Sequence, residues 1–175
     1  MRISLLYIAV GLLFWSCTDG EVKALGEGSS FHVGSGYSRR FQLPDGTKAV
    51  LSPGTSISVA KGFGRDNRDV ELDGEAMFDV IDTGSKPFVV HTRDLVIGVV
   101  AAPARFHVEA DRSRAGEQAD LLGGKLRVSK SYHSDTDNEP ESLAGGEMIM
   151  INRDIDLMEK EKLSAAEIQK LKVRP

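Results

Sequence analysis

Apolar and polar side chains alternate along residues 69–80, and this pattern constrains the fold more than any other feature of the sequence. Its apolar members all occupy even positions: Val70, Leu72, Ala76, Phe78 and Val80. A period of two places successive side chains on opposite faces of a strand, so one face of this segment is predicted to be buried. A tight hairpin at Asp73-Gly74 would turn its two halves to opposite faces. The sequence therefore predicts a bulged loop through Glu75, or a corner where the chain passes to a second layer.

The segment that follows Arg40 predicts a hairpin. Pro44 presets a turn dihedral, and Asp45-Gly46 supplies turn chemistry with a positive φ at Gly46. A three-residue loop from Pro44 to Gly46 keeps every odd position on one face, because it pairs Phe41 with Ala49. A two-residue loop would move the apolar set of one strand into water.

Further segments have the length and apolar content of strands. They cover residues 57–59, 87–90, 95–100, 104–110, 119–122, 125–128 and 143–151. The unbroken apolar run at 95–100 predicts a strand that is covered on both sides. Glycine pairs at 123–124 and 145–146 predict turns, while residues 61–68 and 132–141 predict loops. The chain as a whole is thus predicted to be mainly β.

The C-terminal part changes character. Residues 153–175 predict a polar tail, and Ser164 with Glu167 forms a capping-box pattern in front of Ile168 and Leu171. This pattern predicts a short terminal helix, with lysines near its C-terminal end where the helix dipole favours cations.

The first 16 residues predict a signal or anchor segment. Arg2 precedes an apolar run that ends at Trp15 and is short for a transmembrane helix. Cys17 follows the small residue Ser16, which resembles a bacterial lipobox and predicts an acylated thiol as lipid anchor. An uncleaved single span and cleavage a few residues later remain open. All three alternatives place the rest of the chain outside the cytoplasm, and residues 17–36 predict a flexible tether, in which Val22, Phe31 and Val33 can form a first weak strand.

Composition narrows the classes of function. The chain has 175 residues, enough for one domain after removal of a signal. Its net charge of −4 gives no electrostatic reason to bind a phosphate backbone, so no nucleic-acid partner is predicted. Cys17 is the only cysteine, which excludes an internal disulfide and a thiolate metal cluster.

The sequence offers no catalytic, cofactor or metal site. The four histidines have no metal-ligand spacing, and His107 between Arg105 and Glu109 is predicted to be a solvated residue on a polar face. The carboxylates Asp73 and Asp79 are predicted to have turn and surface roles, and Glu75 is predicted to cap or pair locally. No known nucleophile or phosphate-loop motif is present, so we predict that the protein is not an enzyme.

The order of these motifs resembles the FecR domain. The resemblance runs from Tyr37 to Ile151, and the FecR-like β domain is placed at residues 37–152. Its motifs are LPDGT at 43–47, LSPGT at 51–55, VELDGEAMFDV at 70–80, KPFVV at 86–90, RFHV at 105–108, LGGKLRV at 122–128 and LAGGE at 143–147. The resemblance implies structural roles for Pro44, Asp45, Gly46, Gly54, Gly74, Glu75, Phe78, Pro87, Phe88, Phe106, Gly124 and Gly146.

The resemblance also implies a fold and a role. FecR-type domains are β-rich, so we expect short antiparallel strands in a two-layer sandwich or a solenoid-like domain, with a short C-terminal helix. The family regulates extracytoplasmic sigma factors from the periplasm, where it receives a signal from an outer-membrane, TonB-dependent transporter, often one for iron chelates. Expected partners are the signalling domain of such a transporter or a sigma-regulator protein, with the N-terminal anchor in a membrane.

The chain departs from the family plan. Only Met1 and Arg2 precede the apolar run, so we expect no cytoplasmic sigma-binding domain, and no further subdomain before Pro175. Residues 100–106 replace a family segment that normally carries a Gly-Thr pair. We therefore predict a periplasmic, membrane-anchored signalling module that works through protein contacts, by strand addition if a sheet edge is exposed. The alternative is a structural or ligand-binding envelope lipoprotein that reuses the scaffold.

Overall fold

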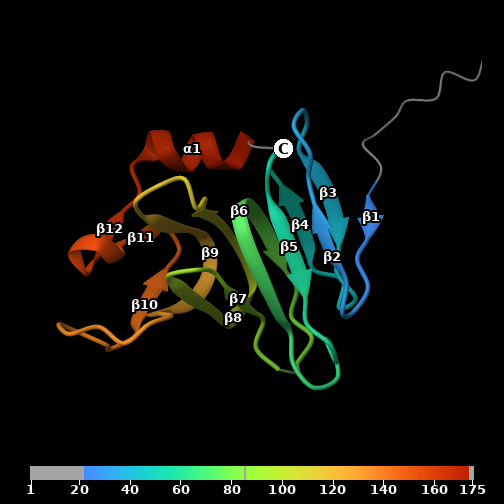
Figure 1. Ribbon diagram of the computed structural model, residues 1–175, viewed down its shortest axis with the longest axis horizontal. Coiled ribbons are helices and arrows are strands. Elements are labelled where there is room, and N and C mark those ends of the chain that lie inside the picture. Colours follow the sequence, from blue (N-terminus) through green and yellow to red (C-terminus); the bar gives the residue numbers. More distant parts are fainter. Residues whose placement is uncertain (1–21, 85, 174–175) are drawn as a thin grey trace, which may run out of the picture.

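The structure is a computed structural model that describes residues 22–84 and 86–173. Cys17 and the predicted signal segment lie outside these residues. Its strands are β1 (Lys23–Ala24), β2 (Ser30–His32), β3 (Arg39–Gln42), β4 (Lys48–Leu51), β5 (Ser56–Val59), β6 (Asp69–Val80), β7 (Val89–His91), β8 (Leu95–Ala110), β9 (Glu117–Lys130), β10 (Glu141–Ala144), β11 (Glu147–Asn152) and β12 (Leu157–Lys162). A short 3-10 helix, η1 (Arg153–Ile155), precedes β12, and α1 (Ala165–Val173) follows it (Figure 1).

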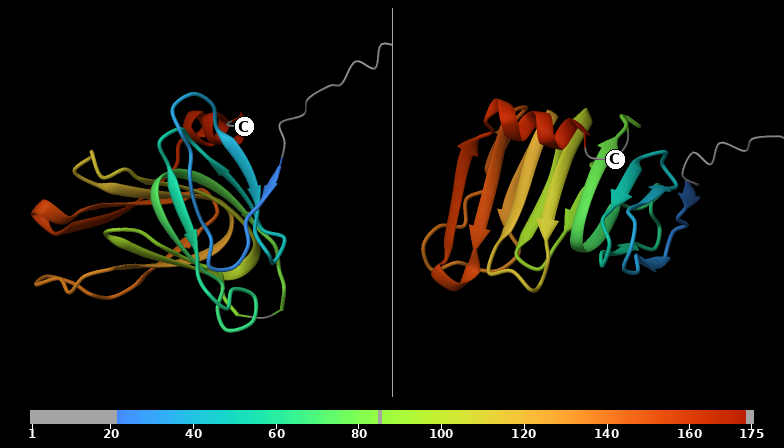
Figure 2. Two further views of the ribbon diagram at one scale, coloured as in Figure 1. Left: turned by 45° about the vertical axis from the view of Figure 1, so that its right-hand side comes forward. Right: turned by 90° about the horizontal axis from the view of Figure 1, so that it is seen from above.

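Three long strands, β6, β8 and β9, join two layers of one sheet (Figure 2). The first half of β6 pairs with β5 and β7, whereas its second half pairs with β4 and β8. In the same way, β9 pairs with β10 in its last part and with β11 in its first part. The predicted mainly-β fold with antiparallel strands and a short C-terminal helix is confirmed, apart from two parallel pairings, β1 with β3 and β6 with β7.

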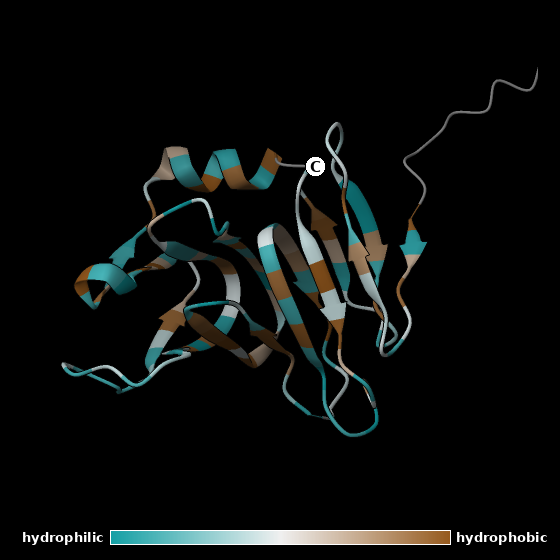
Figure 3. Ribbon diagram, in the orientation of Figure 1, coloured by the Kyte–Doolittle hydropathy of each residue, from teal (hydrophilic) through white to brown (hydrophobic). Residues whose placement is uncertain are grey.

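The corner predicted near Asp73-Gly74 is where β6 passes from one layer to the other. Gly74 has a φ of 119°, and a Cβ there would lie 2.6 Å from the Thr55 hydroxyl oxygen. The strand continues through this position without a hairpin, so its even-numbered apolar residues stay on the core face. Figure 3 shows this alternation of hydropathy along β6.

The layer that contains the second half of β6 has apolar side chains on both of its faces. The main core lies between the layers and includes the stacked rings of Phe78 and Phe106, whose centroids are 5.4 Å apart. On the outer face, Leu171 of α1 packs against Met77 of β6 and Met148 of β11. The helix thus covers the face that the alternation of β6 leaves outside the main core.

Two local predictions are confirmed in detail. Phe41 pairs with Ala49 across a three-residue loop, and Gly46 has a φ of 90°. At the start of α1, the backbone N–H of Glu167 donates to the Ser164 hydroxyl at 3.3 Å, and the backbone N–H of Ser164 donates to the Glu167 carboxylate at 2.7 Å. These reciprocal bonds form the capping box.

Two predictions about apolar and glycine-rich segments are wrong. Residues 95–100 are not covered on both sides, because Leu95 and Ile97 face the core while Val100 is 58% exposed. An antiparallel sheet can leave one face in water. Residues 123–124 do not form a turn but lie inside β9, where a Cβ on Gly124 would meet Ala104 of β8 at 2.7 Å.

Other segments also differ from expectation. The predicted exposed loop 61–68 buries Phe63 and Arg68. Residues 22–36, predicted as part of a tether, contain β1 and β2 and place Leu25 and Val33 in the core. The polar tail contains β12, whose LMEKEK sequence lacks apolar alternation because neither face of this strand is fully buried. Within the described residues, no helix is long and apolar enough to cross a membrane.

Candidate functional site

The structure brings many of the predicted motif residues into two polar clusters. Asp45 and Phe88 contact Arg68, and Pro44, Gly46 and Pro87 are their neighbours in the chain. Glu75 contacts His107, and Gly54 and Gly74 line the same cavity as Glu75. We call these the Arg68 cluster, formed by Asp45, Thr47, Arg68 and Phe88, and the His107 cluster, formed by Glu75, His107, Glu109 and Asp120.

The remaining motif residues have packing or turn positions. Phe78 and Phe106 stack in the core, Gly124 lies against β8, and Gly146 ends the turn between β10 and β11. The family resemblance implied structural roles for these four residues, and that assignment stays a prediction.

The Arg68 cluster is centred on a buried ion pair. The Arg68 Nη2 and Nε atoms donate to the Asp45 carboxylate at 2.6 and 2.8 Å, and the side chains are only 5% and 3% exposed. Thr47 donates to the same carboxylate from its backbone N–H at 2.8 Å and its hydroxyl at 3.0 Å. Arg68 also donates to the carbonyl oxygens of Lys86 at 3.1 Å and Ile81 at 3.2 Å.

This arrangement joins three segments that are distant in the sequence. Asp45 comes from the β3–β4 turn, Arg68 stands just before β6, and Lys86 lies just before β7. The guanidinium carbon of Arg68 is 5.7 Å from the centre of the Phe88 ring, which packs against Phe78. A buried charge is tolerated when it is paired and its hydrogen bonds are satisfied, so the cluster fixes these three segments relative to one another.

Sequence reasoning found Asp45 but missed Arg68. The segment that ends at Arg68 is polar and rich in turn residues, which is typical of an exposed loop. The available signal was Asp45 itself, because a carboxylate in a turn between two apolar strands can be buried only with a cation beside it.

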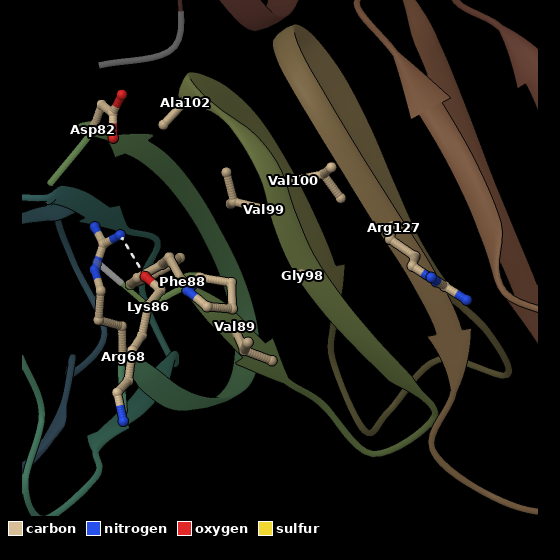
Figure 4. A pocket seen from close by; sticks show the side chains of 11 residues that line it. Arg68, Asp82, Lys86, Phe88, Val89, Gly98, Val99, Val100, Ala102 and Arg127 are labelled. Atoms are coloured by element: carbon tan, nitrogen blue, oxygen red, sulfur yellow. Dashed lines mark hydrogen bonds between the residues drawn. The ribbon is translucent and has the colours of Figure 1, made fainter. Parts of the chain in front are cut away.

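A groove of about 480 Å³ opens beside the Arg68 cluster, between the segment before β7 and strand β8 (Figure 4). Phe88 and Val99 are buried residues of its lining, and Val100 is 58% exposed. Next to the groove, the pairing of β8 with β9 is interrupted by register shifts between Val99 and Arg105. The strand therefore offers apolar side chains that the regular sheet does not cover.

Charged side chains surround this apolar lining. Arg127 of β9 is exposed, and the structure gives it no ion-pair partner among residues 22–84 and 86–173. The Lys86 ammonium group donates to the carbonyl oxygen of Asp66 at 2.6 Å, and the exposed Asp82 adds one negative charge. We call this surface the Val100 groove, defined by Lys86, Phe88, Val99, Val100 and Arg127. Its combination of apolar and cationic groups suits an apolar segment that carries a carboxylate.

The prediction of a solvated His107 is wrong. Its side chain is 2% exposed because it lies between β6 and β9, the neighbours of β8. The Nδ1 atom is 3.0 Å from the Asp120 carboxylate and the Nε2 atom is 3.0 Å from the Glu75 carboxylate. Asp120 is 4% exposed and also accepts from the Gln118 side-chain amide at 2.6 Å. Alternation marked His107 as outward-facing, but that face is partly covered by the neighbouring side chains.

A threonine from a different turn holds the backbone of Glu75 in place. The Thr55 hydroxyl accepts from the N–H of Glu75 at 2.9 Å and donates to its carbonyl oxygen at 3.0 Å. This double contact requires the close approach of Thr55 to Gly74. The LSPGT motif thus positions the carboxylate that faces His107.

The described sheet edges do not favour strand addition. β1 and β2 have two and three residues, β10 has four, and β12 alternates Glu159, Lys160, Glu161 and Lys162. Short and charged edge strands discourage pairing with another chain. The predicted recognition by strand addition is therefore replaced by the Val100 groove as the candidate binding surface.

The fold is a two-layer β module that carries the motifs of one family. The family model described as "FecR protein" matches residues 29–127. The chain therefore belongs to the FecR family, a regulatory rather than enzymatic family, which confirms the predicted resemblance.

Two solved structures are similar to this chain over most of its length. Both are crystal structures of a candidate anti-sigma factor from Parabacteroides distasonis ATCC 8503, at 2.50 and 1.65 Å resolution. Each has a TM-score of 0.70 and 28% sequence identity, and covers 81% of this chain. The similarity spans 62% and 63% of those chains. A search of curated proteins finds no match.

Proposed function

We propose that this protein is a periplasmic FecR-like signalling module that binds a protein partner through the Val100 groove. The proposed partner is the signalling domain of an outer-membrane, TonB-dependent transporter, or a sigma-regulator protein, in a pathway linked to iron uptake. The protein acts by binding rather than by catalysis, and an N-terminal anchor keeps it at a membrane.

The groove is the observation that carries this proposal. Membership of the FecR family supports a signalling role, and signalling through a small β module requires a surface that a partner can recognise. In the Val100 groove, an exposed apolar side chain lies beside the exposed cation Arg127. Apolar groups in such a surface contribute most of the affinity, whereas charges at the rim set specificity and association rate.

In-cell photocrosslinking tests the contact directly. A photoreactive amino acid at position 100 places the probe in the groove, and one at Ile155 serves as a matched control, because Ile155 is 67% exposed and lies outside the groove. We expect position 100, but not position 155, to capture a transporter signalling domain or a sigma-regulator protein, identified by mass spectrometry. Capture of envelope polymers or unrelated lipoproteins at both positions would show that the scaffold has a structural use.

Two groove variants separate the apolar contribution to affinity from the electrostatic contribution to the association rate. We expect Val100→Asp to weaken the captured complex by about tenfold or more, because it places a carboxylate on the apolar lining. Arg127→Glu should reduce chiefly the association rate and its dependence on salt. Lys125→Glu, an exposed charge reversal on the same strand, is the control.

The anchor has an independent test. Metabolic labelling with radioactive palmitate should label the wild-type protein but not Cys17→Ala. An unlabelled wild-type protein that still sediments with membranes would favour the uncleaved span. An unlabelled soluble protein would favour cleavage beyond Cys17.

A further inference from the structure

The His107 cluster has the composition of a metal site. Glu75 of β6 and His107 and Glu109 of β8 each offer one ligand atom, and these atoms all lie within 4.8 Å of one another. Asp120 of β9 stands behind the imidazole. We propose that Glu75, His107 and Glu109 bind a divalent transition-metal ion of the Zn²⁺ class, with Asp120 as the residue that orients His107.

The strand geometry brings these ligands together. His107 and Glu109 are two residues apart on one strand, so their side chains emerge on the same face. Glu75 pairs directly with Glu109 across the β6–β8 ladder. Three ligands from two paired strands are rigidly spaced, and the Thr55 contacts to the Glu75 backbone add to this rigidity.

The imidazole is oriented as a metal-binding histidine requires. A ligating histidine usually donates its second ring N–H to a carboxylate, which fixes the tautomer and leaves the other nitrogen for the metal. Here the Nδ1 atom lies 3.0 Å from Asp120, so Nε2 points to Glu75. Two ligands that each stand about 2.0–2.1 Å from a tetrahedral Zn²⁺ are about 3.3–3.4 Å apart, so the 3.0 Å between Nε2 and the Glu75 oxygen needs to lengthen only slightly.

A bound ion would replace contacts that the ligands already make. Nε2 of His107 lies 3.0 Å from the Glu75 carboxylate. Glu109 pairs with the Arg114 guanidinium at 2.6 Å, and the Arg114 side chain is 61% exposed, so the ion would compete with an exposed arginine for this carboxylate.

A small acidic cavity leads to the ligands. Its volume is about 110 Å³, and its lining includes the carboxylates of Asp73, Glu75, Glu109 and Asp111 together with Arg114. Arg112 pairs with Asp73 at 2.8 Å and Arg114 pairs with Glu109, so the four carboxylates face two cations and the cavity keeps a surplus of negative charge that attracts a cation. Glu75 and Glu109 are 30% and 25% exposed, which leaves room for a water molecule as a fourth ligand.

Calorimetric titration of the full chain with Zn²⁺ tests the proposal. The protein is purified in detergent with a tag that contains no histidine, and Cys17→Ser removes the single thiol. We expect one Zn²⁺ to bind per chain. Absence of binding would overturn the proposal.

Variants assign the ion to this cluster. Glu109→Gln and Asp120→Asn should each weaken binding by roughly 10–100-fold. Glu71→Gln removes an exposed carboxylate from the same strand as Glu75 and should leave the affinity unchanged. Circular dichroism verifies that each variant is folded, and partly exposed Glu109 is the substitution that disturbs the core least. Equal affinity of wild type and Glu109→Gln would place the ion elsewhere, for example on His32, His91 or His133.

Cobalt provides a second readout that does not depend on affinity. Bound Co²⁺ in a four-coordinate site with nitrogen and oxygen ligands has visible d–d absorption, and its spectrum changes when one ligand is replaced. We expect Glu109→Gln to alter or abolish the bands and Glu71→Gln to preserve them. An octahedral, water-like spectrum in the wild-type protein would contradict a built site.

Discussion

The Arg68 and His107 clusters are both built from charged residues between strands, but they differ in how completely they are closed. In the Arg68 cluster, Nε, Nη1 and Nη2 of the guanidinium all donate to protein oxygens, and both charges are buried. In the His107 cluster the imidazole is equally buried, but Glu75 and Glu109 reach a cavity. A closed cluster can only hold segments together, whereas an open one can also exchange a proton or an ion.

The difference follows from the segments that supply the residues. The Arg68 cluster joins two loops and a turn, so the guanidinium replaces backbone partners that a ladder would have provided. The His107 cluster lies on three adjacent strands whose backbones are already paired, so its side chains are not needed to satisfy the backbone. Stability should therefore depend strongly on Arg68 and less on the carboxylates around His107.

Removal of the Arg68 guanidinium should have the largest effect. We expect Arg68→Met to lower the free energy of unfolding by about 3–5 kcal/mol, because it leaves the Asp45 carboxylate buried without its cation. Urea unfolding followed by circular dichroism measures the change. Arg65→Met is the matched control, since the Arg65–Asp66 pair is exposed and should contribute little to stability. Equal effects of the two variants would contradict the structural role of Arg68.

The corner at Gly74 gives the next largest expected effect. Gly74→Ala places a Cβ 2.6 Å from the Thr55 hydroxyl oxygen, at a residue whose φ is 119°. We therefore expect the free energy of unfolding to fall by about 1–3 kcal/mol. Gly54→Ala is the control, because Gly54 also has a positive φ of 82° but has open space around it. A smaller loss for Gly74→Ala than for Gly54→Ala would show that the Thr55 contact does not fix Glu75.

Substitution of Asp120 should cost less than loss of Arg68. We expect Asp120→Asn to lower the free energy of unfolding by about 1–2 kcal/mol, because the amide keeps an acceptor for His107 but loses the charge. Thermal unfolding with and without Zn²⁺ measures this change together with the loss of any metal-dependent stabilisation. A decrease in the free energy of unfolding as large as that for Arg68→Met would show that the His107 cluster also serves mainly to hold its strands together.

Glu117 is a third buried charged residue, and its hydrogen bonds do not fully compensate for its burial. Burial raises the pKa of the Glu117 carboxyl above its usual range, and this outweighs the hydrogen bonds from Thr92 and Asp94. Among the described residues, its Oε1 atom has no hydrogen-bond partner, and Arg93 lies 3.7 Å away. The folded protein therefore holds this proton to a higher pH than the unfolded chain does.

The resulting pH dependence has a definite sign. Glu117 stabilises the fold most below its ordinary pKa of 4.5, and that contribution is lost as the pH rises through the higher pKa of the folded state. We expect Glu117→Gln to flatten this decline in urea unfolding measured between about pH 4 and about pH 7. An unchanged slope in the variant would assign the decline to other groups.

The sequence by itself determined the secondary-structure type, the register of the first hairpin and the capped helix. These features depend on period-two alternation, turn residues and the Ser164–Glu167 pattern, which all act within a few residues. The family resemblance added the set of motif residues, and most of them occupy turns, the core or the two polar clusters. The alternation along residues 69–80 predicted either a loop or a corner at Asp73-Gly74, and alternation alone could not choose between them.

Only the tertiary structure decided which polar residues are buried. Arg68 and His107 belong to segments that look solvent-exposed, because alternation describes one strand at a time and contains no information about its neighbours. Asp45 lies 23 residues from Arg68, and Glu75 lies 32 residues from His107, and no local pattern links either pair. The pairing of β6 with β4, β5, β7 and β8 brings these charges together, and a buried charge is stable only when such a partner is within reach.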